Sequence, residues 1–277
     1  TIEPFGKDHA SRGGSYDTGK RLVREVFGSE PPYPVPYEWI ALKGQGDMSS
    51  SKGNLVSLFD LAQTIPAEVV RYMIFRVKPT RSISFDPGLP LLNLVDEYDD
   101  VTAHNRDARA AELARLEGMP PVGIPFKHLV NLVQITEGDV EKLCTILQRH
   151  HLTLPEPAVL QSRIAYANYW LEHFSPPEIR LHLHKQLPAQ VATLTPAQQQ
   201  ALGILGQRLQ PEMGGDAIHL LVYALAEELA LPAKALFEAV YIALLDQTRG
   251  PRVGWFLSSL EYDFVRARLC EAAALKG

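Results

Sequence analysis

The segment Asp47-Met48-Ser49-Ser50-Ser51-Lys52-Gly53-Asn54 lies between a stretch that predicts a strand and a stretch that predicts a helix. It is a small, hydroxyl-rich loop that carries one cation, Lys52. Backbone amides, hydroxyls and an ammonium can surround a triphosphate and stabilise the charge that moves in a transition state. Ser/Gly loops are common, however, and composition alone favours an ordinary linker. The interpretation of this loop therefore depends on the sequence around it.

The residues on either side of the loop are of two kinds. Residues 1–60 are rich in Gly, Pro and Ser, which predicts loops that join strands and a helix at the edge of an α/β sheet. Residues 37–42 predict one buried strand, and residues 11–27 predict a helix that ends near Gly28. From Pro66 onward, apolar residues recur at helical spacing, so the fold is expected to be mainly α.

Prolines and glycines crowd residues 117–125, which makes this segment the best candidate for a linker between domains. The composition changes near residue 60, from Gly, Pro and Ser to apolar residues at helical spacing. This change and the linker together predict three regions, 1–60, 61–116 and 117–277. The last of these is expected to be helical throughout. Three segments resemble capping boxes that would start helices there: residues 136–139, 195–198 and 258–261.

Composition and charge argue against a membrane protein. Hydrophobic residues make up 46% of the chain and charged residues 21%, as in ordinary soluble proteins. No apolar run reaches the roughly 18 residues that a transmembrane helix needs, and no signal segment opens the chain, so no membrane partner and a cytoplasmic location are expected. Cys144 and Cys270 match no metal or redox spacing, and no metal-binding residues are expected. The net charge of −5 gives no positive support for nucleic-acid binding.

Residues 47–54 resemble the Lys-Met-Ser-Lys-Ser signature loop of class I aminoacyl-tRNA synthetases. Asp47 stands where that loop has its first lysine and Ser50 where it has its second, and three serines before a lysine are typical of the class I lysyl-tRNA synthetases. Lys52, helped by Lys43, would then supply the missing charge, and Ser50 and Lys52 would be the catalytic residues. The resemblance implies five ATP-binding residues in this loop: Met48, Ser49, Ser50, Ser51 and Lys52.

A second segment, Pro4-Phe5-Gly6-Lys7-Asp8-His9, resembles the Gly-x-Asp element in the second half of the class I catalytic core. The resemblance implies that Gly6 lets ATP approach the backbone and that Asp8 receives the ribose hydroxyls. His9 and Tyr37 match the places where the lysyl family contacts its lysine substrate. Without the flanking match, His9 would be interpreted as an ordinary surface or capping histidine.

The resemblance extends nearly to the C-terminus, through residues 84–98 and 250–257. It implies that residues 1–60 are the C-terminal part of a Rossmann-like α/β catalytic core, that 61–116 are a connecting fold and that 117–277 are an all-helical anticodon-binding domain. Unstacked anticodon bases can stack on aromatic rings or accept hydrogen bonds. The candidate tRNA-binding residues are Arg252, Trp255 and Phe256.

The implied function is that of a lysine–tRNA ligase, with ATP and Mg²⁺ as cofactors and with lysine and the lysine tRNA as partners. The family's His-Ile-Gly-His signature does not occur in this sequence, and Ile2-Glu3-Pro4-Phe5 is typical of a segment entered within a strand. We therefore expect a fragment that lacks the N-terminal half of the active site and is inactive alone. Two alternatives stay open: a stand-alone tRNA-binding module without catalysis, and a class I synthetase for another amino acid.

One further match, Gly14-x-x-x-x-Gly19-Lys20, is close to the phosphate-binding P-loop. The next residue is Arg21, so the hydroxyl that would hold magnesium is missing. No strand is expected to lead directly into Gly14. These departures favour a chance match.

Overall fold

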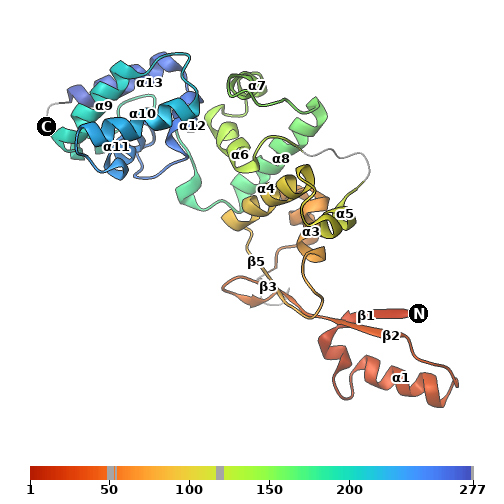
Figure 1. Ribbon diagram of the computed structural model, residues 1–277. Helices are drawn as coiled ribbons and strands as arrows, with labels where there is room; N and C mark the ends of the chain where they lie inside the picture. The colour runs from red at the N-terminus through yellow and green to blue at the C-terminus, as the bar shows by residue number, and fades with distance from the viewer. Residues whose placement is uncertain (49–52, 54, 117–121, 276–277) are drawn as a thin grey trace. The chain divides into compact units, whose positions relative to one another are not determined.

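The computed structural model describes residues 1–48, 53, 55–116 and 122–275. They form two compact units, Thr1–Pro121 (unit 1) and Val122–Gly277 (unit 2). Unit 1 contains β1 (Ile2–Gly6), a 3-10 turn (Lys7–Ala10), α1 (Ser15–Glu25), β2 (Tyr33–Tyr37), β3 (Ile40–Leu42), β4 (Gly46–Asp47), α2 (Leu58–Thr64), α3 (Ala67–Phe75), β5 (Ile83–Phe85), α4 (Leu89–Ala103) and α5 (Ala108–Ala114) (Figure 1).

The elements β1, α1 and β2 form a parallel β-α-β motif, with the two strands side by side (Figure 1). Gly6 pairs with Tyr37, so both strands reach their carboxyl ends at the same place. Tyr16 of α1 stacks on Phe5 of β1 with ring centroids 4.6 Å apart, and its hydroxyl donates to the Pro32 carbonyl at 2.8 Å. The expected helix is present but shorter than residues 11–27, and the α/β character of this end of the chain is confirmed.

The single buried strand expected over residues 37–42 is wrong. β2 ends at Tyr37, and β3 starts at Ile40 in a second sheet of order β4-β3-β5. The Glu38 amide donates to the Pro79 carbonyl at 2.8 Å, which draws the chain away from β1 and toward the segment before β5. Within residues 37–42 only Leu42 is buried, so this segment is not a core strand.

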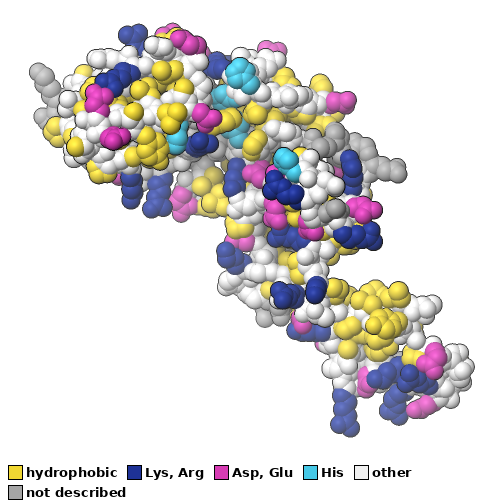
Figure 2. Space-filling view, viewed as in Figure 1, with side chains coloured by type: hydrophobic (Ala, Val, Ile, Leu, Met, Phe, Trp, Pro, Cys, Tyr) yellow, Lys and Arg dark blue, Asp and Glu magenta, His cyan; other side chains and the backbone are white. Residues whose placement is uncertain are grey.

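The helices α3 and α4 of unit 1 share a hydrophobic core, whereas the β-α-β motif buries few side chains. Val69 and Tyr72 of α3 and Val95 of α4 are buried, while no residue of α1 is. Hydrophobic side chains gather on the surface of the β-α-β motif (Figure 2). More than half exposed in this motif and its α1–β2 connection are Ile2, Leu22, Val26, Phe27 and Tyr33. Parallel sheets are normally covered on both faces, so this corner has apolar surface available for packing.

In the described residues of unit 2 all regular structure is helical, which confirms the mainly α fold. The unit contains α6 (Phe126–Ile135), α7 (Val140–Arg149), α8 (Pro157–His173), two 3-10 turns (Pro177–Ile179 and Ala189–Thr193), α9 (Pro196–Arg208), α10 (Gly215–Glu228), α11 (Ala233–Leu245), α12 (Val253–Ser258) and α13 (Tyr262–Ala274). Buried leucines such as Leu202, Leu205 and Leu244 pack α9 to α13 into one core. In the described part of the chain, no helix is long and apolar enough to cross a membrane.

Proline and hydroxyl side chains set many of these helix starts. Pro is tolerated at the first turn because the amide it lacks would have no partner there. Thr195 and Gln198 form the expected capping box at the start of α9. The other two expected boxes are wrong: Thr136 ends α6, and Ser258 lies at the end of α12. Proline stands just before or at the first residue of α3 (Pro66), α6 (Pro125), α8 (Pro157), α9 (Pro196) and α11 (Pro232).

Candidate active site

The carboxyl ends of β1 and β2 bring several candidate residues together. In open α/β sheets ligands bind outside the carboxyl ends of the strands. A Cβ placed on Gly6 would lie 3.5 Å from Asp8 Oδ1, 3.7 Å from His9 Cδ2 and 4.0 Å from Trp39 Cη2. The side chains of Asp8, His9 and Trp39 therefore converge above the bare backbone of Gly6, and Tyr37 is its neighbour on β2.

Close packing of α1 fixes the turn that carries these side chains. A Cβ on Gly14 would lie 2.4 Å from the His9 carbonyl oxygen, closer than real atoms approach. Only glycine lets the N-terminus of α1 rest directly on this turn. Ser15 Oγ lies 2.8 Å from His9 Nδ1, and Ser11 Oγ donates to the Asp8 carbonyl at 2.6 Å. These contacts orient the His9 ring and fix the backbone at Asp8.

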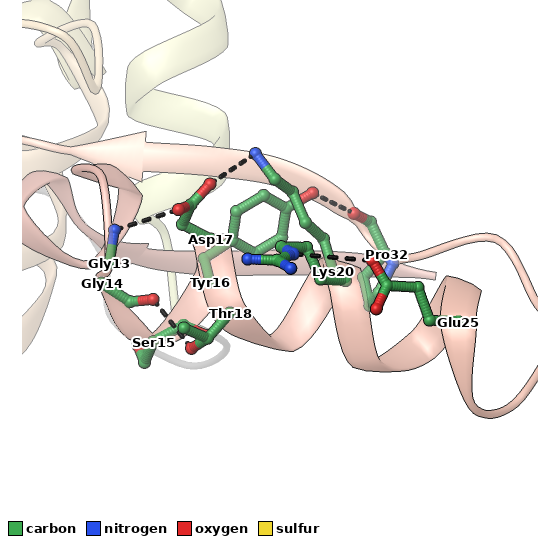
Figure 3. Close-up of polar contacts among 10 residues, drawn as sticks. Gly13, Gly14, Ser15, Tyr16, Asp17, Thr18, Lys20, Glu25 and Pro32 are labelled. Carbon is green, nitrogen blue, oxygen red and sulfur yellow. Dashed lines mark hydrogen bonds and ion pairs between the residues drawn. The ribbon is translucent and has the colours of Figure 1, made fainter.

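The start of α1 is held by its own charged residues (Figure 3). Asp17 accepts a hydrogen bond from the Gly13 amide at 3.0 Å and pairs with Lys20 Nζ at 2.8 Å. The Gly13 amide is the main reason that the pKa of the Asp17 carboxyl is lowered, and Lys20 adds to it. Gly19 and Lys20 lie within the helix rather than in a loop before it, so this segment is not a P-loop, as the sequence predicted.

A cavity of about 710 Å³ lies beside this sheet edge, within unit 1. Tyr37 and Met48, expected at the lysine and ATP sites, both line it. Most of its other walls are apolar or aromatic, and they come from β2, β3, the end of α3 and the segment up to β5. The predicted ATP and catalytic residues Ser49, Ser50, Ser51 and Lys52 lie outside the described residues. Lys43, their expected helper, pairs with Asp86 at 3.2 Å.

The three candidate tRNA-binding residues have different environments in unit 2. Phe256 is 1% exposed and belongs to the helical core, so its ring has no surface for a nucleobase. The expectation that Phe256 binds tRNA is therefore wrong. Of the residues in the short helix α12, all but Trp255 are buried. Arg252 is exposed and pairs with Asp216 at 3.2 Å. Trp255 is partly buried, with His128 and His150 each 4.8 Å from its ring centre in edge-on contact.

The sequence did not predict this histidine cluster, which lies between α6, the end of α7 and α12. His128 Nε2 lies 3.3 Å from His150 Nδ1, and His150 Nε2 lies 3.0 Å from Ser258 Oγ. Burial, with a smaller contribution from the nearby His150, lowers the pKa of His128 to about 4. Burial also lowers the pKa of His150. The cluster therefore consists of neutral rings that support one side of Trp255.

The sequence also left out Glu38 and Trp39, which line the cavity beside Tyr37. Their position directly after a predicted substrate residue was the one available signal. That signal was weak. In the single strand expected over residues 37–42, neighbouring side chains would point to opposite faces, so Glu38 would have pointed away from Tyr37.

Comparison with known proteins identifies the class first. Residues 1–118 match the family model described as tRNA synthetases class I (K). The chain is 41% identical over 300 residues to the lysine–tRNA ligase of Methanosarcina barkeri, which covers 99% of this chain and 56% of that protein. It is 42% identical over 271 residues to the lysine–tRNA ligase of Archaeoglobus fulgidus, which covers 97% of this chain and 54% of that one.

The chain is thus homologous to the class I aminoacyl-tRNA synthetases. Within that class it is a homologue of the class I lysyl-tRNA synthetases, as residues 4–9 and 47–54 predicted. It spans about half the length of the curated relatives that it matches.

Acid should destabilise unit 2 through His128. Its pKa falls from 6.5 to about 4 on folding, so between these values the unfolded chain binds a proton that the folded chain does not. Stability is then lost as the pH drops below 6.5, by up to roughly 3 kcal/mol once the pH is below the folded pKa. Urea unfolding followed by tryptophan fluorescence at several pH values should show this loss.

His128→Leu should make that dependence clearly shallower, whatever its effect on absolute stability, because the leucine does not titrate while His150 still does. His173→Leu, at an exposed position on α8, is the matched control and should keep the wild-type slope. If the stability of His128→Leu fell with pH as steeply as that of wild type, His128 would not be the source of the acid sensitivity.

Proposed function

We propose that this chain is part of a lysine–tRNA ligase, which activates lysine with ATP and transfers it to tRNA. The observation that supports the proposal best is the convergence of Asp8 and His9 above Gly6, beside Tyr37 and a cavity lined by Met48. These are the residues that the resemblance implies for ATP and lysine. The relatives whose names support lysine match 97–99% of the chain.

The reaction would proceed in two steps. A carboxylate oxygen of lysine attacks the α-phosphorus of ATP, the bond to pyrophosphate breaks, and lysyl-adenylate forms. A ribose hydroxyl at the 3′ end of tRNA then attacks the lysyl carbonyl, and AMP leaves with the electron pair of the broken bond. Neither step needs a covalent protein intermediate, so the protein contributes positioning and charge stabilisation.

The roles of the residues follow from their places. Gly6 leaves room for the nucleotide at the end of β1, and Asp8 would accept hydrogen bonds from the ribose hydroxyls. The hydroxyls and ammonium of residues 48–52 would contact the phosphates, with Ser50 and Lys52 acting as the charge moves. ATP would bring Mg²⁺ on its own phosphates, as this ion usually does. His9, fixed by Ser15, would face the lysine substrate together with Tyr37.

The chain alone should not form lysyl-adenylate. The apolar surface of the β-α-β motif argues that further protein must cover it before the site is complete. We expect no lysine-dependent ATP–pyrophosphate exchange from the purified 277-residue chain. Replacing the matching part of the M. barkeri enzyme with this chain should give a chimera that exchanges.

Exchange by the isolated chain, free of contaminants, would contradict the first expectation. A folded chimera that binds ATP but activates an amino acid other than lysine would support the alternative of a different class I synthetase.

Lys52→Ala in that chimera should slow adenylate formation by about 100-fold or more, because one charge on the phosphates would be lost in the transition state. The KM for lysine should change much less. Lys142→Ala, on the exposed face of α7, is the matched control and should leave both unchanged. Equal, small effects of Lys52→Ala on rate and lysine affinity would argue against a phosphate role.

The helical unit supports a second, more limited function, tRNA binding without catalysis. It has its own core, and Arg252 and part of Trp255 reach its surface. At fixed salt, the chain should bind a lysine tRNA transcript about tenfold more tightly than one with a changed anticodon, the scale of one stacked base. Arg252→Ala should weaken the binding of both transcripts. Arg208, which pairs with Glu228 on another helix, is the matched control, and Arg208→Ala should leave both affinities unchanged. Equal binding of the two transcripts would remove the anticodon assignment.

A further inference from the structure

An ion pair joins the two strands at the edge where the candidate active site lies. Lys7 Nζ is 2.6 Å from Glu38 Oε2. Lys7 opens the turn that carries Asp8 and His9, and Glu38 directly follows Tyr37. The Lys7 side chain is 53% exposed and that of Glu38 is 25% exposed. Glu38 is thus a half-buried carboxylate that already holds a lysine ammonium.

Glu38 also lines the cavity of about 710 Å³. Among the residues that the structure describes, it is the one carboxylate in the lining. Tyr37, Trp39 and Phe75 give the cavity aromatic walls, and the cations Lys78 and Arg81 come from the exposed segment after α3. A single carboxylate beside apolar walls suits a ligand with a long aliphatic arm that ends in a cation.

Lysine has this chemistry: four methylene groups that favour apolar walls, and an ε-ammonium that needs a carboxylate. We propose that Glu38 receives the ε-ammonium of the lysine substrate, and that Lys7 occupies this carboxylate when no substrate is bound. The proposal rests on the proposed function, to which it adds the residue that selects the substrate. It makes Glu38 a specificity-determining residue and Lys7 its internal competitor.

The energies of the two ion pairs favour this exchange. A pair between exposed side chains contributes little, because water and salt screen it and two long side chains must be held in place. Breaking the ion pair between Glu38 and Lys7, whose side chain is more than half exposed, therefore costs little. The substrate's ammonium would meet the same carboxylate inside a cavity with apolar walls, where a charged hydrogen bond is stronger. Lys7 can return to water while the substrate takes its place.

The two partners of the ion pair provide a direct test. If the pair only joined β1 to β2, Glu38→Gln and Lys7→Met would have the same effect, because each breaks it. If Glu38 binds the substrate, Glu38→Gln should raise the KM for lysine by about 30-fold or more, the usual result of removing one partner of a partly buried charge pair. Lys7→Met should leave that KM unchanged or lower it.

Both variants would be made in the M. barkeri chimera and measured by ATP–pyrophosphate exchange. The KM for ATP should stay within about twofold of wild type in each, since neither side chain is assigned to the nucleotide. Norleucine, which has the aliphatic arm without the ammonium, supplies a second readout as an inhibitor. Glu38→Gln should bring the affinities for lysine and norleucine closer together, and Lys7→Met should not.

The possible results separate the two proposals. A wild-type chimera that activates lysine, with equal effects of Glu38→Gln and Lys7→Met, overturns the role of Glu38 and leaves the proposed function standing. A folded wild-type chimera that does not activate lysine overturns the proposed function and, with it, this inference. Thermal unfolding of both variants in the 277-residue chain shows whether either substitution acts through the fold instead. Glu38→Asp, which keeps the charge, should recover part of the lost lysine affinity.

Discussion

The parallel pairing that sets Gly6 beside Tyr37 is the constraint on which the candidate active site depends. It brings the carboxyl ends of β1 and β2 together. The turn after β1 then lies next to the first residues after β2. The approach of α1 to the His9 carbonyl completes this arrangement, because the helix can lie against the turn only where position 14 has no side chain. One register and one close contact therefore position groups that are about thirty residues apart in the sequence.

Much of this could be predicted wherever the governing interactions are local. Pro66 before α3 and the box formed by Thr195 and Gln198 act within one helical turn, so sequence alone locates both helix starts. The signature-like loop and the segment around Asp8 were recognisable because such loops depend on a few side chains at fixed spacing. The mainly helical fold follows from apolar spacing in the same way.

What could not be predicted depends on partners far along the chain. The strand expected through Trp39 is broken because the amide of Glu38 bonds to Pro79, some forty residues later. Phe256 has the composition of a base-stacking residue, and only the packing of α9 to α13 shows that it is buried. His128 of α6 and His150 at the end of α7 contact each other, and both rings contact Trp255 of α12. No spacing in the sequence indicates these contacts. In each case a tertiary contact decides between two local interpretations.

The prolines of β2 block one edge of this sheet. The Tyr33 amide donates to the carbonyl of Thr1, the residue before β1, so alternate residues along β2 turn their amide positions toward β1. Pro34 and Pro36 occupy the positions that face the other way. Proline has no amide hydrogen, so the outer edge of β2 lacks donors where a further strand would need them. The edge formed by β2 is therefore protected against adventitious strand addition and aggregation.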